Sequence, residues 1–128
     1  MPPTPRAVTL AICALVFAAP PAWADGDAAK GERVYNTQCK TCHTLDKGGR
    51  HLVGPNMHGL FGRKAGTMEG FKFSEAMIAS GIVWDDKTIA EYIKDPKGRI
   101  PGNTMAFIGL KRQDQIDDVI AYLKKATQ

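Results

Sequence analysis

The sequence has no apolar run long enough to cross a membrane, little cysteine and no strong excess of charge of one sign. The first apolar run, residues 7–19, has thirteen residues, whereas a membrane-spanning helix needs about twenty. The net charge of +4 is too small to indicate nucleic-acid binding, although it suits an acidic protein partner. No segment has a convincing strand pattern, and no internal repeat is visible. These absences favour one small helical domain.

The first 24 residues have the pattern of a secretory signal. A charge at Arg6 precedes the apolar run, prolines at 20–21 end it, and residues 22–24 form an A-x-A cleavage site. We therefore expect a cleaved signal peptide at 1–24, a single domain at 25–128 and a periplasmic location without stable membrane insertion. An uncleaved membrane anchor is the alternative.

Cysteine occurs three times, and Cys13 lies in the expected signal. The other two, Cys39 and Cys42, belong to a C-x-x-C-H motif that ends at His43. Thiols at i and i+3 can form thioether bonds with the two vinyl groups of one porphyrin, and the imidazole that follows can reach the iron. An exported protein meets oxidising conditions, in which a free cysteine pair tends to form a disulfide. Haem attachment would instead use both sulfur atoms. The motif predicts one covalently attached haem c.

A structural zinc site is an alternative use of nearby residues. Cys39, Cys42, His51 and His58 supply a Cys2His2 set, which zinc accepts in tetrahedral geometry. Their spacing is irregular, however, and the domain would then have no other core. The sequence therefore favours haem.

Helix caps and apolar periodicity predict an all-α fold. The expected helices span about 28–39 after Asp27, 74–81 with Ser74 as cap, Asp85 or Asp86 to about 95, and 112–126. Between them, 44–73 and 97–110 are irregular and broken by glycine. Loops of this length are uncommon inside a compact domain, so we expect both to wrap the haem. The result is three main helices with short helices and long loops.

The first predicted helix contains Gly31, four residues before Tyr35 on the same face. A glycine inside a helix costs roughly 0.5–1 kcal/mol relative to alanine. Either another helix crosses closely at this point, or Gly31 is a tolerated surface residue.

The iron needs a second axial ligand. The candidates are His51, His58, Met57, Met68, Met77 and Met105. Met105 is favoured because it follows His43 at a distance that lets the chain reach the far face of the haem, in an apolar irregular stretch. Met77 is the main alternative. A ligating histidine also needs an acceptor for its other ring nitrogen, and the carbonyl of Pro55 is the best placed.

Two stretches make the sequence similar to a known family. Residues 54–63 (GPNMHGLFGR) and 100–107 (IPGNTMAF) resemble the haem-wrapping segments of class I cytochromes c, in particular the mitochondrial-type group and its soluble bacterial relatives. The resemblance runs from about Gly31 to Lys125 and implies the cytochrome c fold.

The resemblance also implies a role for individual residues. Cys39 and Cys42 would form the thioether links, with His43 and Met105 as axial ligands and Pro55 as acceptor for His43. Arg63 and Trp84 would hold the inner haem propionate, and Tyr92 and Phe107 would line the methionine side. Gly31 and Tyr35 would cross the last helix near Val119 and Tyr122.

Four positions depart from the family pattern. Phe73 replaces a tyrosine that donates to a propionate, and Met77 replaces an asparagine of a buried polar network. Gly98 and Thr104 occupy positions that are lysines in the mitochondrial proteins, where those lysines often displace the methionine at high pH. Lys97 is then the nearest substitute.

These features imply a monomeric one-electron carrier rather than an enzyme. A thioether ligand favours the ferrous state. Transient electrostatic docking is expected to a quinol–cytochrome c reductase, a terminal oxidase or a photosynthetic reaction centre through the haem edge near Cys42. The candidate docking residues are Lys40, Lys47, Arg50, Lys72, Lys97, Arg99, Lys111 and Arg112. A peroxidase-like or gas-binding haem protein is the alternative if the Met105 bond is weak.

Overall fold

The computed structural model describes residues 1–3 and 25–128. Residues 4–24, which include most of the expected signal peptide and its cleavage site, lie outside the described residues, so the signal stays a prediction. None of the helices in the described part is long and apolar enough to span a bilayer.

Five helices make up the regular structure of residues 25–128. They are α1 (Ala28–Gln38), α2 (Glu75–Ala79), α3 (Asp86–Lys94), α4 (Pro96–Arg99) and α5 (Gln113–Ala126). Residues 25–128 contain no strand, and their only β-type pairing is an isolated bridge between Lys64 and Val83. The predicted all-α fold, with three longer helices and two short ones, is confirmed.

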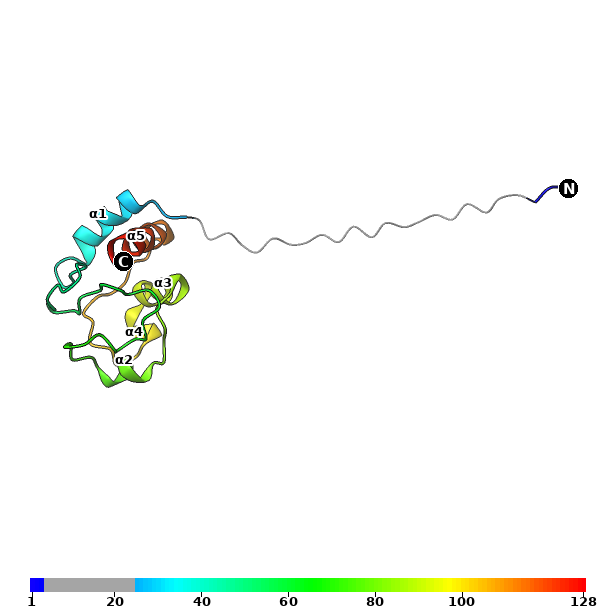
Figure 1. The fold of residues 1–128 in the computed structure, drawn as a ribbon. Helices are drawn as coiled ribbons and strands as arrows, with labels where there is room; N and C mark the ends of the chain where they lie inside the picture. Colours follow the sequence, from blue (N-terminus) through cyan, green and yellow to red (C-terminus); the bar gives the residue numbers. More distant parts are fainter. Residues whose placement is uncertain (4–24) are drawn as a thin grey trace.

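The first and last helices cross at one end of the molecule, while α2 lies at the opposite end (Figure 1). The side chain of Asp27 caps α1 by accepting hydrogen bonds from Ala29 and Lys30 at 2.9 and 3.1 Å, as predicted. A Cβ atom built on Gly31 would lie 1.8 Å from the backbone oxygen of Asp118. The close helix crossing is therefore confirmed, and Gly31 is not a surface glycine.

Apolar side chains from this crossing form the core. α5 buries Ile116, Val119, Ile120 and Leu123, which repeat at intervals of three and four residues and so share one face. They pack with Val34 and Tyr35 of α1 in one cluster. The rings of Tyr35 and Tyr122 lie 5.6 Å apart.

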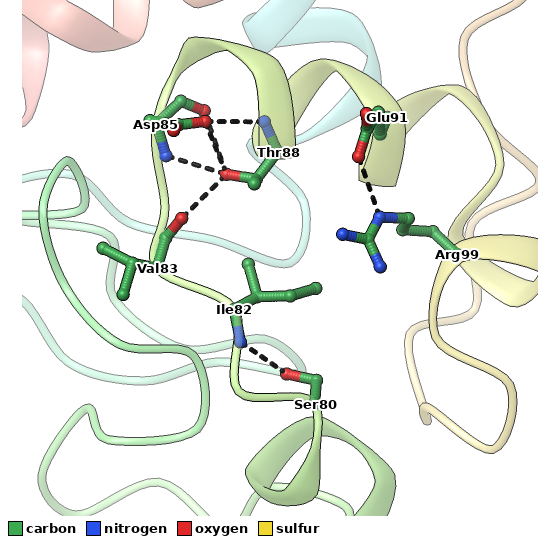
Figure 2. Close-up of polar contacts among 7 residues, drawn as sticks. All are labelled: Ser80, Ile82, Val83, Asp85, Thr88, Glu91 and Arg99. Carbon is green, nitrogen blue, oxygen red and sulfur yellow. Dashed lines mark hydrogen bonds and ion pairs between the residues drawn. The ribbon is translucent and has the colours of Figure 1, made fainter.

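Both middle helices begin at predicted caps. Ser74 accepts from the backbone of Met77 at 3.1 Å at the start of α2. At the start of α3, Asp85 and Thr88 form a reciprocal capping box, and the Thr88 hydroxyl also donates to the Val83 carbonyl (Figure 2).

α4 is not among the helices expected from the sequence, and most of it lies in the stretch 97–110 that we expected to be irregular. Asp95 ends α3 and also caps α4, where its side chain accepts from Gly98 at 3.0 Å. Proline is favoured at the first position of a helix because its missing N–H has no partner there in any case. An ion pair of 2.9 Å between Glu91 and Arg99 joins the two helices (Figure 2).

Backbone hydrogen bonds, rather than helices, hold the long loop in place. Ala65 donates to Ile82 at 2.8 Å, and Trp84 donates to Arg63 at 2.9 Å. Near the end of the chain, Gly59 donates to the carbonyl of Thr127 at 2.5 Å. The loop is thereby tied to α5 and to the segment before α3.

Candidate haem site

The C-x-x-C-H motif forms a tight turn at the end of α1. The backbone N–H groups of Cys42 and His43 both donate to the carbonyl of Cys39 at 3.0 Å. Cys39 and Cys42 are free thiols, each half-buried. Burial, followed by the charge of Cys42, raises the pKa of the Cys39 thiol to about 11. The turn therefore presents two free thiols three residues apart, unbonded to each other, and the thiol of Cys39 is protonated at neutral pH.

His43 is fixed with one ring nitrogen committed and the other available. Its Nδ1 lies 2.8 Å from the carbonyl oxygen of Pro55. A carbonyl can only accept, so Nδ1 carries the proton and Nε2 keeps its lone pair. Burial lowers the pKa of His43, although the Pro55 hydrogen bond opposes this. The neutral imidazole is the form that binds a metal.

Gly54 leaves room for this imidazole. A Cβ atom there would lie 2.4 Å from Cε1 of His43. The Gly54 N–H also donates to the Cys42 carbonyl at 2.8 Å, which holds the loop against the motif. The hydroxyl of Tyr35 donates to the His43 carbonyl at 2.8 Å. Residues from α1 and from the loop thus position the histidine together.

The methionine side is built from a different part of the chain. Met105 is half-buried, and its sulfur lies 3.8 Å from the hydroxyl of Tyr92 on α3. Burial raises the pKa of Tyr92 to about 12, so its hydroxyl stays protonated at neutral pH. The ring of Tyr92 packs on Trp84 at 5.3 Å, and Phe107 packs against the same core.

Arg63 and Trp84 are both expected near a haem propionate. They are neighbours because the N–H of Trp84 donates to the carbonyl of Arg63. The Arg63 side chain is half-buried, and its Nη2 donates to the carbonyl of His58 at 2.6 Å. This contact orients the guanidinium and leaves its other N–H groups without a partner among residues 25–128. That these N–H groups of Arg63 bind a haem propionate stays a prediction.

The expected docking residues are all exposed but differ in their own contacts. Arg99 pairs with Glu91, Arg112 pairs with Asp114, and the ammonium of Lys111 donates to two backbone carbonyls at 3.0 Å. The other five form no ion pair within the described chain: Lys40, Lys47, Arg50, Lys72 and Lys97. This second group is the better placed to meet an outside charge.

The departures from the family pattern have local explanations. Phe73 packs edge-on against Phe71 at 4.8 Å and offers no hydroxyl, and Met77 is a buried core residue. A side chain at Gly98 would meet the capping carboxylate of Asp95, since its Cβ would lie 2.1 Å from Oδ2. Thr104 is exposed.

His51 has a structural role that its position in the sequence does not reveal. One ring nitrogen lies 2.8 Å from the Glu69 carbonyl, and the other accepts from the backbone of Asn56 at 3.0 Å. With both nitrogens engaged, His51 cannot ligate a metal. Nowhere in the described residues do three His, Cys, Asp or Glu side chains converge on one point, so the zinc hypothesis is wrong.

The donor set fits an iron porphyrin. Two unpaired thiols follow one helix, a neutral imidazole presents a free nitrogen, and a thioether comes from a different part of the chain, beside Tyr92 of α3. Gly54 provides the space that the imidazole requires. This fold and this combination of donors define a c-type haem protein of the small, mostly helical class.

Comparison with known proteins agrees. Residues 28–127 match the family described as Cytochrome c. The chain is 48% identical over 111 residues to cytochrome c of Chlamydomonas reinhardtii, covering 87% of this chain and 96% of that protein. It is 48% identical over 99 residues to cytochrome c2 of Blastochloris viridis, covering 77% of each. Cytochrome c of Gibberella zeae is 47% identical over 105 residues, covering 82% of this chain and 99% of the relative.

The chain therefore belongs to the cytochrome c family, which confirms the resemblance. It is a mono-haem electron carrier with one covalently attached haem c. Members of the family pass electrons to redox partners and are not enzymes.

Proposed function

We propose that this chain is an exported, monomeric one-electron carrier, with Cys39 and Cys42 as thioether links and His43 and Met105 as axial ligands. The observation that carries the ligand assignment is the commitment of His43 Nδ1 to Pro55 at 2.8 Å. That bond leaves Nε2 as the only donor atom of the ring. On the other side, the position of the Met105 sulfur beside Tyr92 supports Met105 over Met77, which is buried in the apolar core.

The haem supplies a ferric–ferrous couple when it is bound. His43 and Met105 would hold the iron from both sides, which would leave no coordination position for a substrate. The thioether of Met105 favours the ferrous state. Buried Trp84 and Tyr92 keep water from the methionine side, and a partly oriented Arg63 is suited to a propionate.

Electrons would be exchanged near Cys42, and exposed lysines would guide the partner. Lys40, Lys47, Lys72 and Lys97 support this role because each is exposed without an ion pair in the described chain. The partners fitting a small basic carrier are membrane redox complexes: a quinol–cytochrome c reductase, a terminal oxidase or a photosynthetic reaction centre. The signal-like pattern at 1–24 supports a periplasmic location.

An optical spectrum of the ferric holoprotein tests the ligand assignment. A methionine-to-iron charge-transfer band is expected, whereas a high-spin spectrum would contradict Met105 ligation and favour a ligand-binding haem protein. Mass spectrometry tests attachment and export together, since the mass should equal one haem plus a chain that begins at Asp25. Kinetics with purified membrane complexes would identify the partner.

A further inference from the structure

A small groove lies where the segment before α1 meets α3 and α5. Its volume is about 270 Å³, below the roughly 300–1,000 Å³ of pockets that hold drug-sized ligands. The charged residues that line it are Asp25, Asp86, Asp117, Lys124 and Lys125, and the rest of the lining is small or apolar. A groove of this size suits one small charged group.

The chain is held tightly against α5 where it enters this groove. A Cβ atom on Gly26 would lie 2.1 Å from the carbonyl oxygen of Asp117, so the backbone at this position touches the helix. The next residue, Asp27, donates its N–H to the side chain of Asp118, and α1 begins beside α5 (Figure 1). Because consecutive Cα atoms are about 3.8 Å apart, the backbone nitrogen of Asp25 stays within about 5 Å of the Gly26 Cα.

The charges of the groove do not balance within the described chain. It holds three carboxylates and two ammonium groups, which leaves one negative charge in excess. Asp86 pairs with Lys124. Asp117 is half-buried and forms no ion pair with any described residue, and its Oδ1 accepts only from the neutral amide of Gln113, at 2.8 Å. Lys125 lies eight residues further along α5, about 12 Å by helical rise. Asp117 is therefore the carboxylate that lacks a cation.

The missing cation is unlike a metal ion, since no three His, Cys, Asp or Glu side chains converge anywhere in the described residues. Signal cleavage supplies another. Hydrolysis of the peptide bond between Ala24 and Asp25 consumes one water, leaves a carboxylate on Ala24 and frees the amino group of Asp25, which takes up a proton. The pKa of such a group is ordinarily about 7.7–8.0, so it is mostly charged at neutral pH.

We propose that this groove is a docking site for the chain's own mature α-ammonium group, with Asp117 as the carboxylate that pairs with it. The inference rests on the proposed export and on cleavage before Asp25. An uncleaved chain has an uncharged amide at this position and cannot form the pair. Removal of the signal would then add an ion pair that fastens the segment before α1 to the last helix.

The experiment measures the pKa of the α-amino group in the exported holoprotein. N-terminal mass spectrometry first establishes the starting residue. Trace acetylation with acetic anhydride over a pH series then titrates the amine, and the label on the N-terminal peptide is quantified by mass spectrometry. The pKa should be about half a unit higher in the folded protein than in the same protein in urea, as expected for one exposed ion pair.

Two variants on the same helix identify the partner of the amine. Asp117→Asn removes the charge and can still accept from Gln113, so the α-amino pKa should fall to the value in urea. Asp114→Asn makes the same charge change outside the groove, at a residue that pairs with Arg112, and should leave the α-amino pKa unchanged. An equal fall in both variants would overturn the assignment to Asp117.

Melting temperature gives a second, independent measurement. A Gly-Ser extension before Asp25 moves the amine by about 7 Å. A group whose folded pKa is raised stabilises the fold below its unfolded pKa, and the contribution is lost as pH rises through the folded pKa. The mature holoprotein should therefore melt above the extended form at about pH 7 and equally with it at about pH 9.5, and Asp117→Asn should abolish the difference.

The outcomes separate this inference from the one on which it rests. A mature chain that starts at another residue would overturn cleavage before Asp25. A chain that starts at Asp25 but has the same α-amino pKa folded and in urea would leave the cleavage standing and overturn the docking of the amine. Equal melting temperatures of the mature and extended forms at neutral pH would overturn it as well.

Discussion

Gly31 of α1 and Asp118 of α5 approach so closely that no side chain fits between them. A Cβ atom added at Gly31 would lie only 1.8 Å from the carbonyl oxygen of Asp118. The N–H of Asp27 donates to the side chain of the same Asp118 at 2.7 Å. Asp118 of α5 therefore contacts α1 at two places, at its cap Asp27 and at Gly31 within the helix.

Gly31→Ala should destabilise the protein although alanine is the better helix former. Helix propensity alone would stabilise the variant by about 0.8–1 kcal/mol, whereas forcing the helices apart costs about 1–3 kcal/mol or more. Urea denaturation of the holoprotein measures the difference. Asn36→Ala, at an exposed position of the same helix, should be neutral or mildly stabilising. A stabilised Gly31→Ala would show that the crossing can relax.

Met105→Ala should lower the reduction potential by on the order of 0.2 V, a part of the range of about 0.8 V over which axial ligands move haem potentials. The iron should then bind imidazole or azide readily. Potentiometric titration and optical spectra measure both effects. Met68→Ala, at another half-buried methionine, is the control and should change neither. An unaltered potential in Met105→Ala would mean that another residue is the ligand.

Reversing charge at Lys40 and Lys97 to glutamate should slow electron transfer with an acidic partner by roughly tenfold at low salt, because steering accelerates association. The effect should shrink as ionic strength rises and the Debye length falls to about 10 Å at 0.1 M. Stopped-flow kinetics over a salt series measure it. Reversing Lys87 and Lys125 to glutamate together makes the same charge change at two exposed positions outside the proposed docking set. If it slows the reaction equally, net charge rather than a docking surface controls the rate.

Acid should weaken the start of α3. Hydrogen bonds from the backbone and hydroxyl of Thr88 hold the pKa of Asp85 below its ordinary value of 3.8. Because the folded pKa is the lower one, this carboxylate stabilises the fold above pH 3.8, and the contribution is lost as pH falls through the folded pKa. Melting temperatures from pH 7 to pH 2 should therefore fall less steeply in Asp85→Asn, which keeps a cap without a titrating group. An equal fall in melting temperature in the unchanged protein and in Asp85→Asn would contradict this role of the Asp85 carboxylate.

The sequence was sufficient for the helix starts, since Asp27, Ser74 and Asp85 are strong caps followed by suitable patterns. It was insufficient for α4, because a helix of only four residues has no periodicity to detect. Asp95 also looked like the last residue of one helix rather than the shared end of two.

The site was predictable where it follows a covalent motif or a family pattern. The His43–Pro55 hydrogen bond and the place of Met105 beside Tyr92 are of this kind, while the ligand roles of His43 and Met105 stay predictions. The role of His51 was not predictable, because it comes from backbone groups that approach the ring only in the folded chain. No spacing rule shows that a histidine will have both nitrogens engaged.

The pairing of α1 with α5 also affects the order of events during synthesis. A chain is made from its N-terminus, and the contact between Asp27 and Asp118 spans 91 residues. The thiols of Cys39 and Cys42 therefore precede α5 out of the ribosome and, in the proposed exported chain, across the membrane behind the N-terminal signal. Attachment after export would thus take place on a chain whose last helix has not yet packed, and the packing of α5 would seal a core that already contains its cofactor.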